Sequence, residues 1–204
     1  MAGPHKLVQY RPLGFSCQSA VLDFGLIVYL QSDTHFSTTN LMISQEGGSM
    51  KQLNPDHIAA IRAHINNCPY FNLLSMKIDT LEMGRSSLEV DVQEKHLQPF
   101  GIVHGGVYAS LIDAAAFWAA YSTVDGSSGM TTVEMKLNYL APAASGRFIA
   151  KGKSIKTGKT LCLSEATIFD DKEKMLAHGT VTLMVLNSLE INTKDELPPK
   201  YLTP

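Results

Sequence analysis

The feature that most constrains this chain is the stretch from His96 to Tyr121, HLQPFGIVHGGVYASLIDAAAFWAAY. It begins as a polar loop, passes through His104-Gly105-Gly106 and becomes an apolar run that a single charge, Asp113, interrupts. A helix that is apolar on almost all sides must be covered on most of them. A carboxylate in such a helix costs several kcal/mol to desolvate, so Asp113 is neutralised, paired, exposed at an interface or kept for chemistry.

The segments on either side of this stretch predict an α+β fold. Asn54, Pro55 and Asp56 supply an N-cap, a proline at the first helical position and an early acid, so a short helix is expected there. Six further segments read as strands, over residues 73–83, 86–93, 131–140, 147–155, 160–170 and 174–186. Short turns between consecutive strands imply antiparallel pairing. A curved antiparallel sheet wrapped around one long central helix would cover that helix, and the leftover sheet edges invite dimerisation.

The predicted domain spans residues 50–188, and the sequence on both sides of it differs in character. Residues 1–49 show no sustained period of helix or strand and are interpreted as an appendage, not a domain. Gln45-Glu46-Gly47-Gly48-Ser49 before Met50 is what a purine-rich ribosome-binding sequence gives when it is translated in frame. A translated leader is therefore one hypothesis, and a genuine linker is the other. The tail over residues 189–204 is polar and is expected to be loose.

Charge and cysteine usage narrow the class of protein. The formal net charge is −2, so no global field would recruit nucleic acid or an anionic membrane. Three widely spaced cysteines without a metal-binding pattern predict thiols in a reducing cytoplasm and no metal site. The N-terminus lacks a basic region followed by a clean apolar run and a cleavage site, so secretion is not expected. His57 and His64, on the first helix, are expected to be solvated or capping and not metal ligands.

The spacing within the long helix predicts that the working unit is a dimer. Glycines at a helix start leave backbone N–H groups unpaired, which creates a site for an oxyanion. Gly106 and Asp113 share a helical face but lie about 10 Å apart along the axis, at a rise of about 1.5 Å per residue. A reacting carbonyl must lie within roughly 3 Å of both its oxyanion donor and its base or nucleophile. One helix cannot easily supply both groups, whereas two antiparallel copies across a dimer axis could.

Two runs of the sequence resemble a known family. Gln98-Pro99-Phe100-Gly101-Ile102-Val103-His104-Gly105-Gly106, followed by Asp113, is similar to the signature of hotdog-fold acyl-CoA thioesterases of the phenylacetate-degradation (PaaI-like) branch. Residues 132–143, TVEMKLNYLAPA, resemble the strand that follows in those proteins, and residues 174–186 resemble their last strand. The resemblance covers about residues 53–186. It implies a hotdog fold, hydrolysis of acyl-CoA by a homodimer, with tetramers left open, and no cofactor beyond the coenzyme A of the substrate.

The resemblance also implies roles for individual residues. Asp113 matches the catalytic carboxylate, either as general base for water or as nucleophile toward the thioester carbonyl. Gly105 matches the residue whose backbone N–H faces the developing oxyanion. Gln98 stands where Asn is usual and would orient the water or the thioester. Thr132 would place the attacking water beside the carboxylate of the partner chain, and His104 would cap the helix rather than act as base.

Substrate contacts are expected from three further places. Gly106 lies beside the oxyanion site at the helix start. Phe117, at a position where some relatives have a hydroxyl residue, suggests an aromatic acyl pocket, and a plain core residue is the alternative. In the family the nucleotide of coenzyme A lies near the later strands, where Lys156, Gly158 and Lys159 could meet its phosphates. A solvated strand face would explain the same lysines.

Three alternatives stay open from the sequence. Asp113 could be a structural acid that accepts hydrogen bonds from a neighbouring subunit. The enzyme could be a hotdog hydratase or dehydratase of 2-enoyl thioesters, in which His104 does acid–base work with a carboxylate. The chain could also be a non-catalytic acyl-CoA-binding module. The acyl group that is cleaved does not follow from the sequence, because residues of two subunits set the depth of such pockets.

Overall fold

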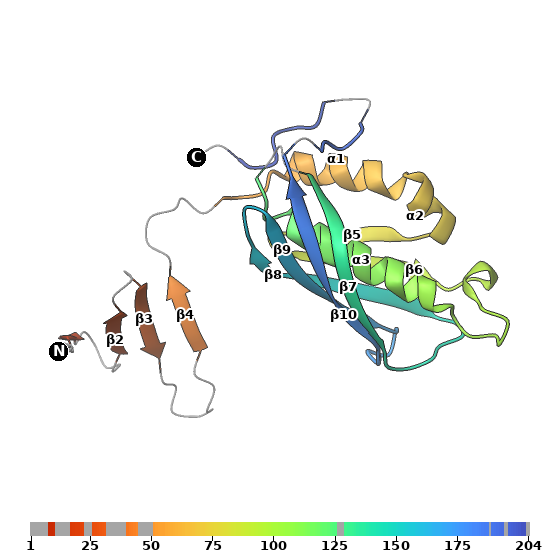
Figure 1. Ribbon diagram of the computed structural model, residues 1–204, viewed down its shortest axis with the longest axis horizontal. Helices are drawn as coiled ribbons and strands as arrows, with labels where there is room; N and C mark the ends of the chain where they lie inside the picture. Colours follow the sequence, from red (N-terminus) through yellow and green to blue (C-terminus); the bar gives the residue numbers. More distant parts are fainter. Residues whose placement is uncertain are drawn as a thin grey trace. The chain divides into compact units, whose positions relative to one another are not determined.

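Figure 1 shows a computed structural model of the chain. The structure describes residues 8–10, 17–22, 26–31, 40–44, 51–125, 129–187, 189–193 and 196–202. The chain divides into two compact units, Met1–Met50 and Lys51–Pro204. All residues that the sequence assigns to the site belong to the second unit.

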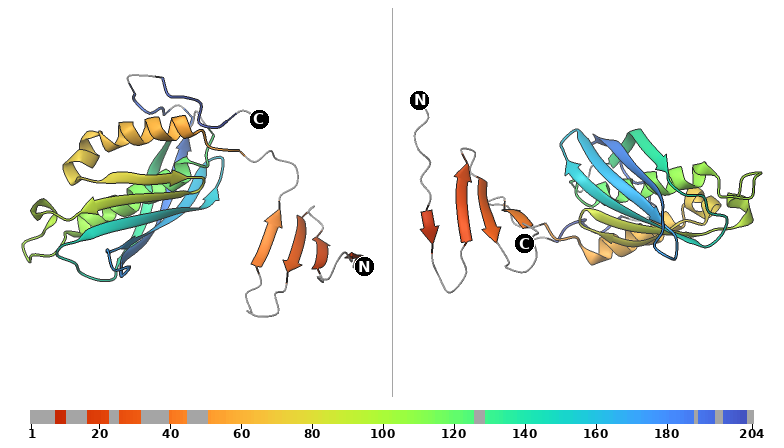
Figure 2. Two further views of the ribbon diagram at one scale, coloured as in Figure 1. Left: turned by 180° about the vertical axis from the view of Figure 1, so that it is seen from behind. Right: turned by 90° about the horizontal axis from the view of Figure 1, so that it is seen from below.

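The second unit has the predicted α+β architecture. Its helices are α1 (Pro55–Asn66), α2 (Pro69–Leu74), the short 3-10 helix η1 (Glu94–His96) and α3 (Gly105–Tyr121). Its strands are β5 (Lys77–Glu82), β6 (Arg85–Asp91), β7 (Gly129–Tyr139), β8 (Arg147–Thr157), β9 (Leu161–Phe169) and β10 (Met175–Leu186). The strands pair antiparallel in the order β5-β6-β8-β9-β10-β7, and Figures 1 and 2 show the sheet curving around α3. The prediction of a curved antiparallel sheet around one long helix is confirmed.

Small residues let α3 lie close against the sheet. A Cβ atom at Gly152 of β8 would come within 2.1 Å of the carbonyl oxygen of Ala115 in α3. Ser86 of β6 donates a hydrogen bond of 2.6 Å from its Oγ to the same carbonyl. Because Ala115 follows Asp113 by two residues, these contacts fix where the acid lies relative to the sheet. Among the described residues no helix combines the length and the apolarity needed to cross a membrane.

The first helix begins as predicted, but the segment after it differs. The side chain of Asn54 accepts the backbone N–H of Asp56 at 3.0 Å and caps α1. The strand predicted from Leu73 onward is wrong at its start, because residues 69–74 form α2 and Leu73 lies on its exposed side. Ser75, with a φ of 53°, ends α2 before β5 begins. A short apolar run fits a helix and a strand equally well, so its sequence alone does not decide between them.

The N-terminal unit contains more regular structure than the sequence predicts. Its strands are β1 (Val8–Tyr10), β2 (Cys17–Leu22), β3 (Leu26–Gln31) and β4 (Asn40–Ser44), which pair antiparallel in chain order. The sequence did not reveal these strands, since each is too short to show a sustained alternation, and the interpretation of residues 1–49 as an appendage stays a prediction. Residues 45–50, which carry the hypothesis of a translated leader, lie outside the described residues.

The C-terminal tail is packed against the domain, where a loose tail was expected. Tyr201 forms an isolated antiparallel bridge with Leu53, just before α1. The backbone N–H of Asn54 donates to the carbonyl of Lys200 at 2.9 Å, and Lys200 is only 4% exposed. These contacts join two segments from opposite ends of the domain, so the tail is part of the fold.

His57 is buried beneath this tail, which corrects the prediction that it is solvated or capping. Its Nδ1 lies 2.7 Å from the carbonyl oxygen of Pro198 and its Nε2 lies 3.0 Å from the hydroxyl of Tyr121. Since a carbonyl only accepts, Nδ1 carries the proton and Nε2 accepts the hydroxyl. Burial lowers the pKa of His57, so the neutral ring is favoured at this position.

Candidate active site

The start of α3 confirms the capping role predicted for His104. Its Nδ1 accepts the backbone N–H of Gly106 at 2.9 Å, and its own backbone has the extended conformation of an N-cap residue. The N–H of Gly106 is therefore already used in the helix cap, and a substrate contact of Gly106 stays a prediction. In the described part of the chain no acceptor is bonded to the N–H of Gly105. Of the two glycines, Gly105 alone retains an unpaired donor for an oxyanion.

The loop before α3 brings Gln98 beside Gly105. A turn closes at Gly101, whose N–H donates to the Gln98 carbonyl at 2.9 Å and whose φ of 75° suits glycine. Gln98 and Gly105 line one hollow of about 430 Å³, here named the glycine hollow. Its other lining residues come from the same loop, α3 and the end of β7, and are Ile102, Val103, Tyr108, Tyr139, Leu140, Ala141 and Pro142. The structure thus unites the predicted oxyanion donor with the predicted orienting amide.

Asp113 lies two turns further along α3 and is half-buried. Thr132 of β7 donates from its Oγ1 to Asp113 Oδ1 at 2.7 Å. The prediction that Thr132 stands beside the partner's carboxylate is therefore wrong in this detail, because the hydroxyl is bonded to the acid of its own chain. The hydrogen bond between Thr132 and Asp113 follows from the topology. Strand β7 is an edge strand of the sheet, and α3 packs against that sheet. The hydroxyl therefore holds one of the two carboxylate oxygens of Asp113 in place.

A second hollow of about 470 Å³, here named the acid hollow, contains Asp113 and Thr132. Phe117 lines it as well, so the predicted aromatic lining is present there. The remaining residues that line the acid hollow are Tyr70, Phe71, Ala109, Ser110, Ala114, Trp118 and Met135. The glycine hollow and the acid hollow share no lining residue. Gly105 and Asp113 are eight residues apart on α3, which corresponds to about 12 Å along its axis.

Known proteins that match this chain identify its family. The thioesterase superfamily matches residues 100–177, which run from the loop before α3 to the start of β10. The chain is 31% identical over 112 residues to the 1,4-dihydroxy-2-naphthoyl-CoA hydrolase of Listeria monocytogenes, a match that covers 55% of this chain and 91% of that protein. This chain belongs to the thioesterase superfamily. As a member of this family it is a thioester hydrolase, and the resemblance seen in the sequence is confirmed.

Further relatives support the family and the fold. The chain is 31% identical over 101 residues to human acyl-coenzyme A thioesterase 13, covering 48% of this chain and 71% of that protein. A thioesterase family protein from Silicibacter pomeroyi superimposes with a TM-score of 0.58 at 34% identity, covering 64% of this chain and 98% of that chain. A thioesterase from Haemophilus influenzae, 22% identical, shares the fold with a TM-score of 0.60, covering 65% and 92% of the two chains. The predicted hotdog fold is therefore confirmed.

The residues predicted to meet coenzyme A lie apart from both hollows of this thioesterase. Gly158 and Lys159 line a third hollow at the C-terminal end of α3, together with Asp125, whereas Lys156 is exposed on β8 outside it. Gly158 sits in a tight turn, because a Cβ there would come within 2.5 Å of the Leu161 carbonyl oxygen. The Gly158 N–H donates to that oxygen at 3.0 Å. The geometry of the turn therefore explains a glycine at this position without a contact to coenzyme A.

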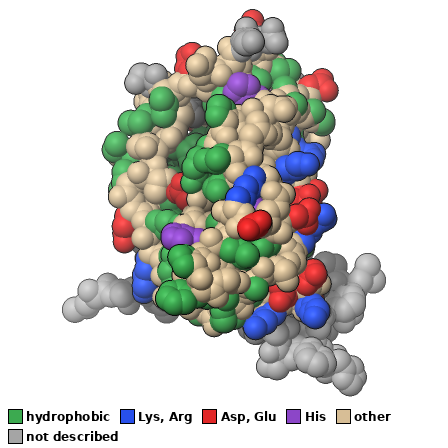
Figure 3. All heavy atoms as spheres, turned by 90° about the vertical axis from the view of Figure 1, so that its right-hand side faces the viewer, with side chains coloured by type: hydrophobic (Ala, Val, Ile, Leu, Met, Phe, Trp, Pro, Cys, Tyr) green, Lys and Arg blue, Asp and Glu red, His purple; other side chains and the backbone are tan. Residues whose placement is uncertain are grey.

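Figure 3 shows the face of the thioesterase that lies at the right-hand side of Figure 1. Hydrophobic side chains border a hollow on this face, and lysine, arginine and acidic side chains are interspersed around it. A mixed surface of this kind gives no single-sign field.

Within the described ranges no three His, Cys, Asp or Glu side chains are grouped closely enough to hold a metal ion. The absence of a cofactor stays a prediction.

The sequence missed two polar residues of the acid hollow. The hydroxyl of Tyr70, on α2, lies 2.7 Å from Ser110 Oγ, on α3. Ser110 stands three residues before Asp113 on the same helical face, so its position could have been found from the helical spacing. Tyr70 could not have been found from the sequence, because the segment that carries it shows no pattern that predicts a helix.

Proposed function

We propose that this thioesterase hydrolyses acyl-CoA to a free acid and coenzyme A, with an aryl or medium-chain acyl group, in a site made by two chains. Gly105 and Gln98 of one chain would face Asp113 and Thr132 of the other. The observation that carries the proposal is the separation of the two pairs into hollows about 12 Å apart on one helix. A carbonyl cannot be within roughly 3 Å of both in a single chain.

The chemistry follows from what each group can donate or accept. Asp113 removes a proton from water, the water oxygen attacks the thioester carbon, and the carbonyl electrons move onto the oxygen. The N–H of Gly105 stabilises that oxyanion, because it is unpaired and fixed at a helix start. The intermediate then expels the thiolate of coenzyme A, which takes up a proton. Direct attack by Asp113 to give a mixed anhydride is the alternative within this proposal.

Thr132 and His104 fit this proposal as positioning residues. The hydroxyl of Thr132 holds Asp113 Oδ1 at 2.7 Å and so orients the carboxylate. His104 uses its Nδ1 to accept the N–H of Gly106, which occupies that nitrogen in the helix cap. This use of His104 favours a thioesterase over a hydratase in which the same ring would carry the proton.

The aromatic lining of the acid hollow supports an aryl or medium-chain acyl group. Four aromatic side chains border Asp113 there, namely Tyr70, Phe71, Phe117 and Trp118. The relative from Listeria monocytogenes is named for an aromatic acyl-CoA, and the human relative is named for acyl-coenzyme A in general. We further propose that Lys156, Gly158 and Lys159 meet the phosphates of coenzyme A, that no cofactor is required, and that the enzyme acts in the cytoplasm.

The first test is the variant Asp113→Asn, which keeps the shape of the side chain and removes the base. Thiol release would be measured over a panel of aryl, short-chain and long-chain acyl-CoAs. We expect kcat to fall by about 100-fold or more, with the melting temperature unchanged. Asp79→Asn, an exposed acid on β5, is the control and should retain full activity. Turnover by Asp113→Asn at the parental rate would refute the assignment.

The second test asks whether two chains share the site. Asp113→Asn and Gln98→Ala chains, each inactive alone, would be mixed and allowed to exchange subunits. A heterodimer then contains one intact site, so the mixture should regain about a quarter of the parental activity. Mixing would restore nothing if each chain held a complete site.

A further inference from the structure

Tyr70 is the one residue of the acid hollow whose side chain is largely exposed and yet held in place. Tyr70 is 55% exposed, and its hydroxyl lies 2.7 Å from Ser110 Oγ. Ser110 Oγ in turn donates to the carbonyl of Gly106 at 2.8 Å. A serine hydroxyl has one proton, so the Tyr70 hydroxyl is the donor in the bond between them. Two consecutive hydrogen bonds thus fix an exposed ring at the start of α3.

The position of Tyr70 relative to the acid follows from the helical spacing. Ser110 precedes Asp113 by three residues and Phe117 follows it by four, so the three side chains share one face of α3. Ser110, and the Tyr70 ring anchored to it, therefore stand about 4.5 Å before Asp113 along the axis. Tyr70 borders the acid hollow on the side of the helix start.

The opposite side of the acid hollow is closed by packed aromatic rings. Phe117 and Trp118 meet edge to face at 5.2 Å between centroids, and Trp118 meets Tyr121 in the same way at 5.0 Å. Trp118 is 6% exposed, so this wall belongs to the core. Tyr70, by contrast, can be shortened without opening a cavity in the core.

We propose that Tyr70 is a specificity-determining residue that limits the length of the acyl group, an inference that rests on the proposed hydrolysis at Asp113. Gly158 and Lys159, which are proposed to meet coenzyme A, line the hollow at the C-terminal end of α3. The acyl group, on the other side of the thioester carbon, then extends toward Ser110 and meets the ring of Tyr70. The hollow accepts an aryl or medium-chain acyl group and excludes a long alkyl chain.

The experiment compares the full chain with its Tyr70→Ala and Tyr70→Phe variants on straight-chain acyl-CoAs of increasing length. Tyr70→Ala should raise the ratio of kcat/KM for long over short chains by about tenfold or more, since it removes the end wall. Tyr70→Phe keeps the ring and should shift that ratio by less than about threefold. Leu73→Ala, which changes an exposed residue of α2 outside the acid hollow, is the matched control and should leave the ratio unchanged.

A binding measurement separates this inference from the proposed function. S-alkyl thioethers of coenzyme A cannot be hydrolysed, so calorimetric titration reports their fit whether or not turnover occurs. In the parent protein Kd should rise with chain length, and in Tyr70→Ala the rise should disappear. If Kd rose with chain length equally in the parent and in Tyr70→Ala, the proposed role of Tyr70 would be overturned. Thiol release by the parent would still support the proposed hydrolysis. Should Tyr70→Ala fail to fold, Tyr70→Val makes the same comparison.

Discussion

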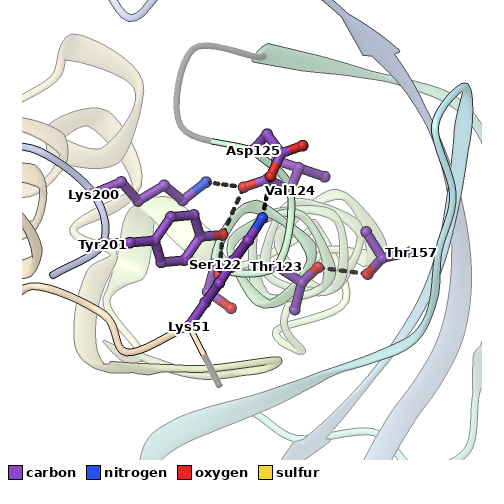
Figure 4. Close-up of polar contacts among 8 residues, drawn as sticks. All are labelled: Lys51, Ser122, Thr123, Val124, Asp125, Thr157, Lys200 and Tyr201. Atoms are coloured by element: carbon purple, nitrogen blue, oxygen red, sulfur yellow. Dashed lines mark hydrogen bonds and ion pairs between the residues drawn. The ribbon is translucent and has the colours of Figure 1, made fainter. Parts of the chain in front are cut away.

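Lys200 offers the sharpest quantitative test of the structure. Figure 4 shows its ammonium group beside Val124, which follows the C-terminal end of α3, and Nζ donates to the carbonyl of Val124 at 2.8 Å. The same nitrogen lies 3.8 Å from the centroid of the Tyr121 ring. Burial lowers the pKa of Lys200 to about 8 from its ordinary value of 10.5, and the neighbouring Asp125 only partly offsets this. The tail expected to be loose therefore carries a buried charge.

The pKa difference sets the size and the sign of the effect. A lowering of roughly 2.5 units corresponds to about 3 kcal/mol against the charged form in the folded state. Between pH 8 and 10.5 the unfolded chain binds more protons at this group, so the free energy of unfolding rises with pH. From about pH 7 to pH 9.5 the expected gain from Lys200 is about 2 kcal/mol. Burial raises the pKa of Tyr121 and Tyr201 to about 12, which opposes this gain only above about pH 10.

The perturbation is Lys200→Met, with the exposed Lys172→Met as control. At about pH 7 we expect the variant to lie within about 1 kcal/mol of the parent, because the lost hydrogen bond and ring contact offset the relieved desolvation. The Val124 carbonyl keeps a donor, since the Tyr201 hydroxyl lies 2.7 Å from it. At about pH 9.5 the variant should lack the gain of about 2 kcal/mol that the parent and the control both show.

The assay is urea unfolding at fixed protein concentration, followed by the fluorescence of the single tryptophan, Trp118. Trp118 is buried beside Tyr121 and so reports on this end of α3. The reasoning is refuted if the difference in unfolding free energy between parent and Lys200→Met stays constant within about 0.5 kcal/mol across this pH range.

Two further predictions concern the domain itself. Gly152→Ala should lower the free energy of unfolding by about 2 kcal/mol or more, because the new Cβ would lie 2.1 Å from the Ala115 carbonyl oxygen. Urea unfolding measures this loss. The control Lys151→Ala, on the exposed face of the same strand, should change the free energy of unfolding little. A chain that begins at Met50 should keep its thiol-release activity and its melting temperature within about 2 °C, because residues 51–204 form a compact unit with their own core. A large loss in either property would show that residues 1–49 support the enzyme domain.

The sequence predicted the candidate site through local signals. His104 has the residue type and position of an N-cap, and the structure confirms that its side chain accepts the Gly106 N–H. Helical spacing alone placed Asp113 too far from the glycines to share a carbonyl with them, and the two separate hollows agree with that distance. These inferences depend on hydrogen bonds and rises within a few residues, which one stretch of chain specifies by itself.

The tertiary structure decided what depends on residues far apart in the chain. The hydrogen bond between His57 and Pro198 joins positions 141 residues apart, and the hydrogen bond between Lys200 and Val124 spans 76 residues. No local sequence pattern predicts either bond. Pairing of Thr132 with Asp113 of the same chain, and of Tyr70 with Ser110, likewise required the sheet and α2 to be placed against α3. The sequence by itself determined the long helix, its cap and its acid, because period and capping are local. The fold alone determined which side chains surround that acid, because burial depends on the whole packed domain.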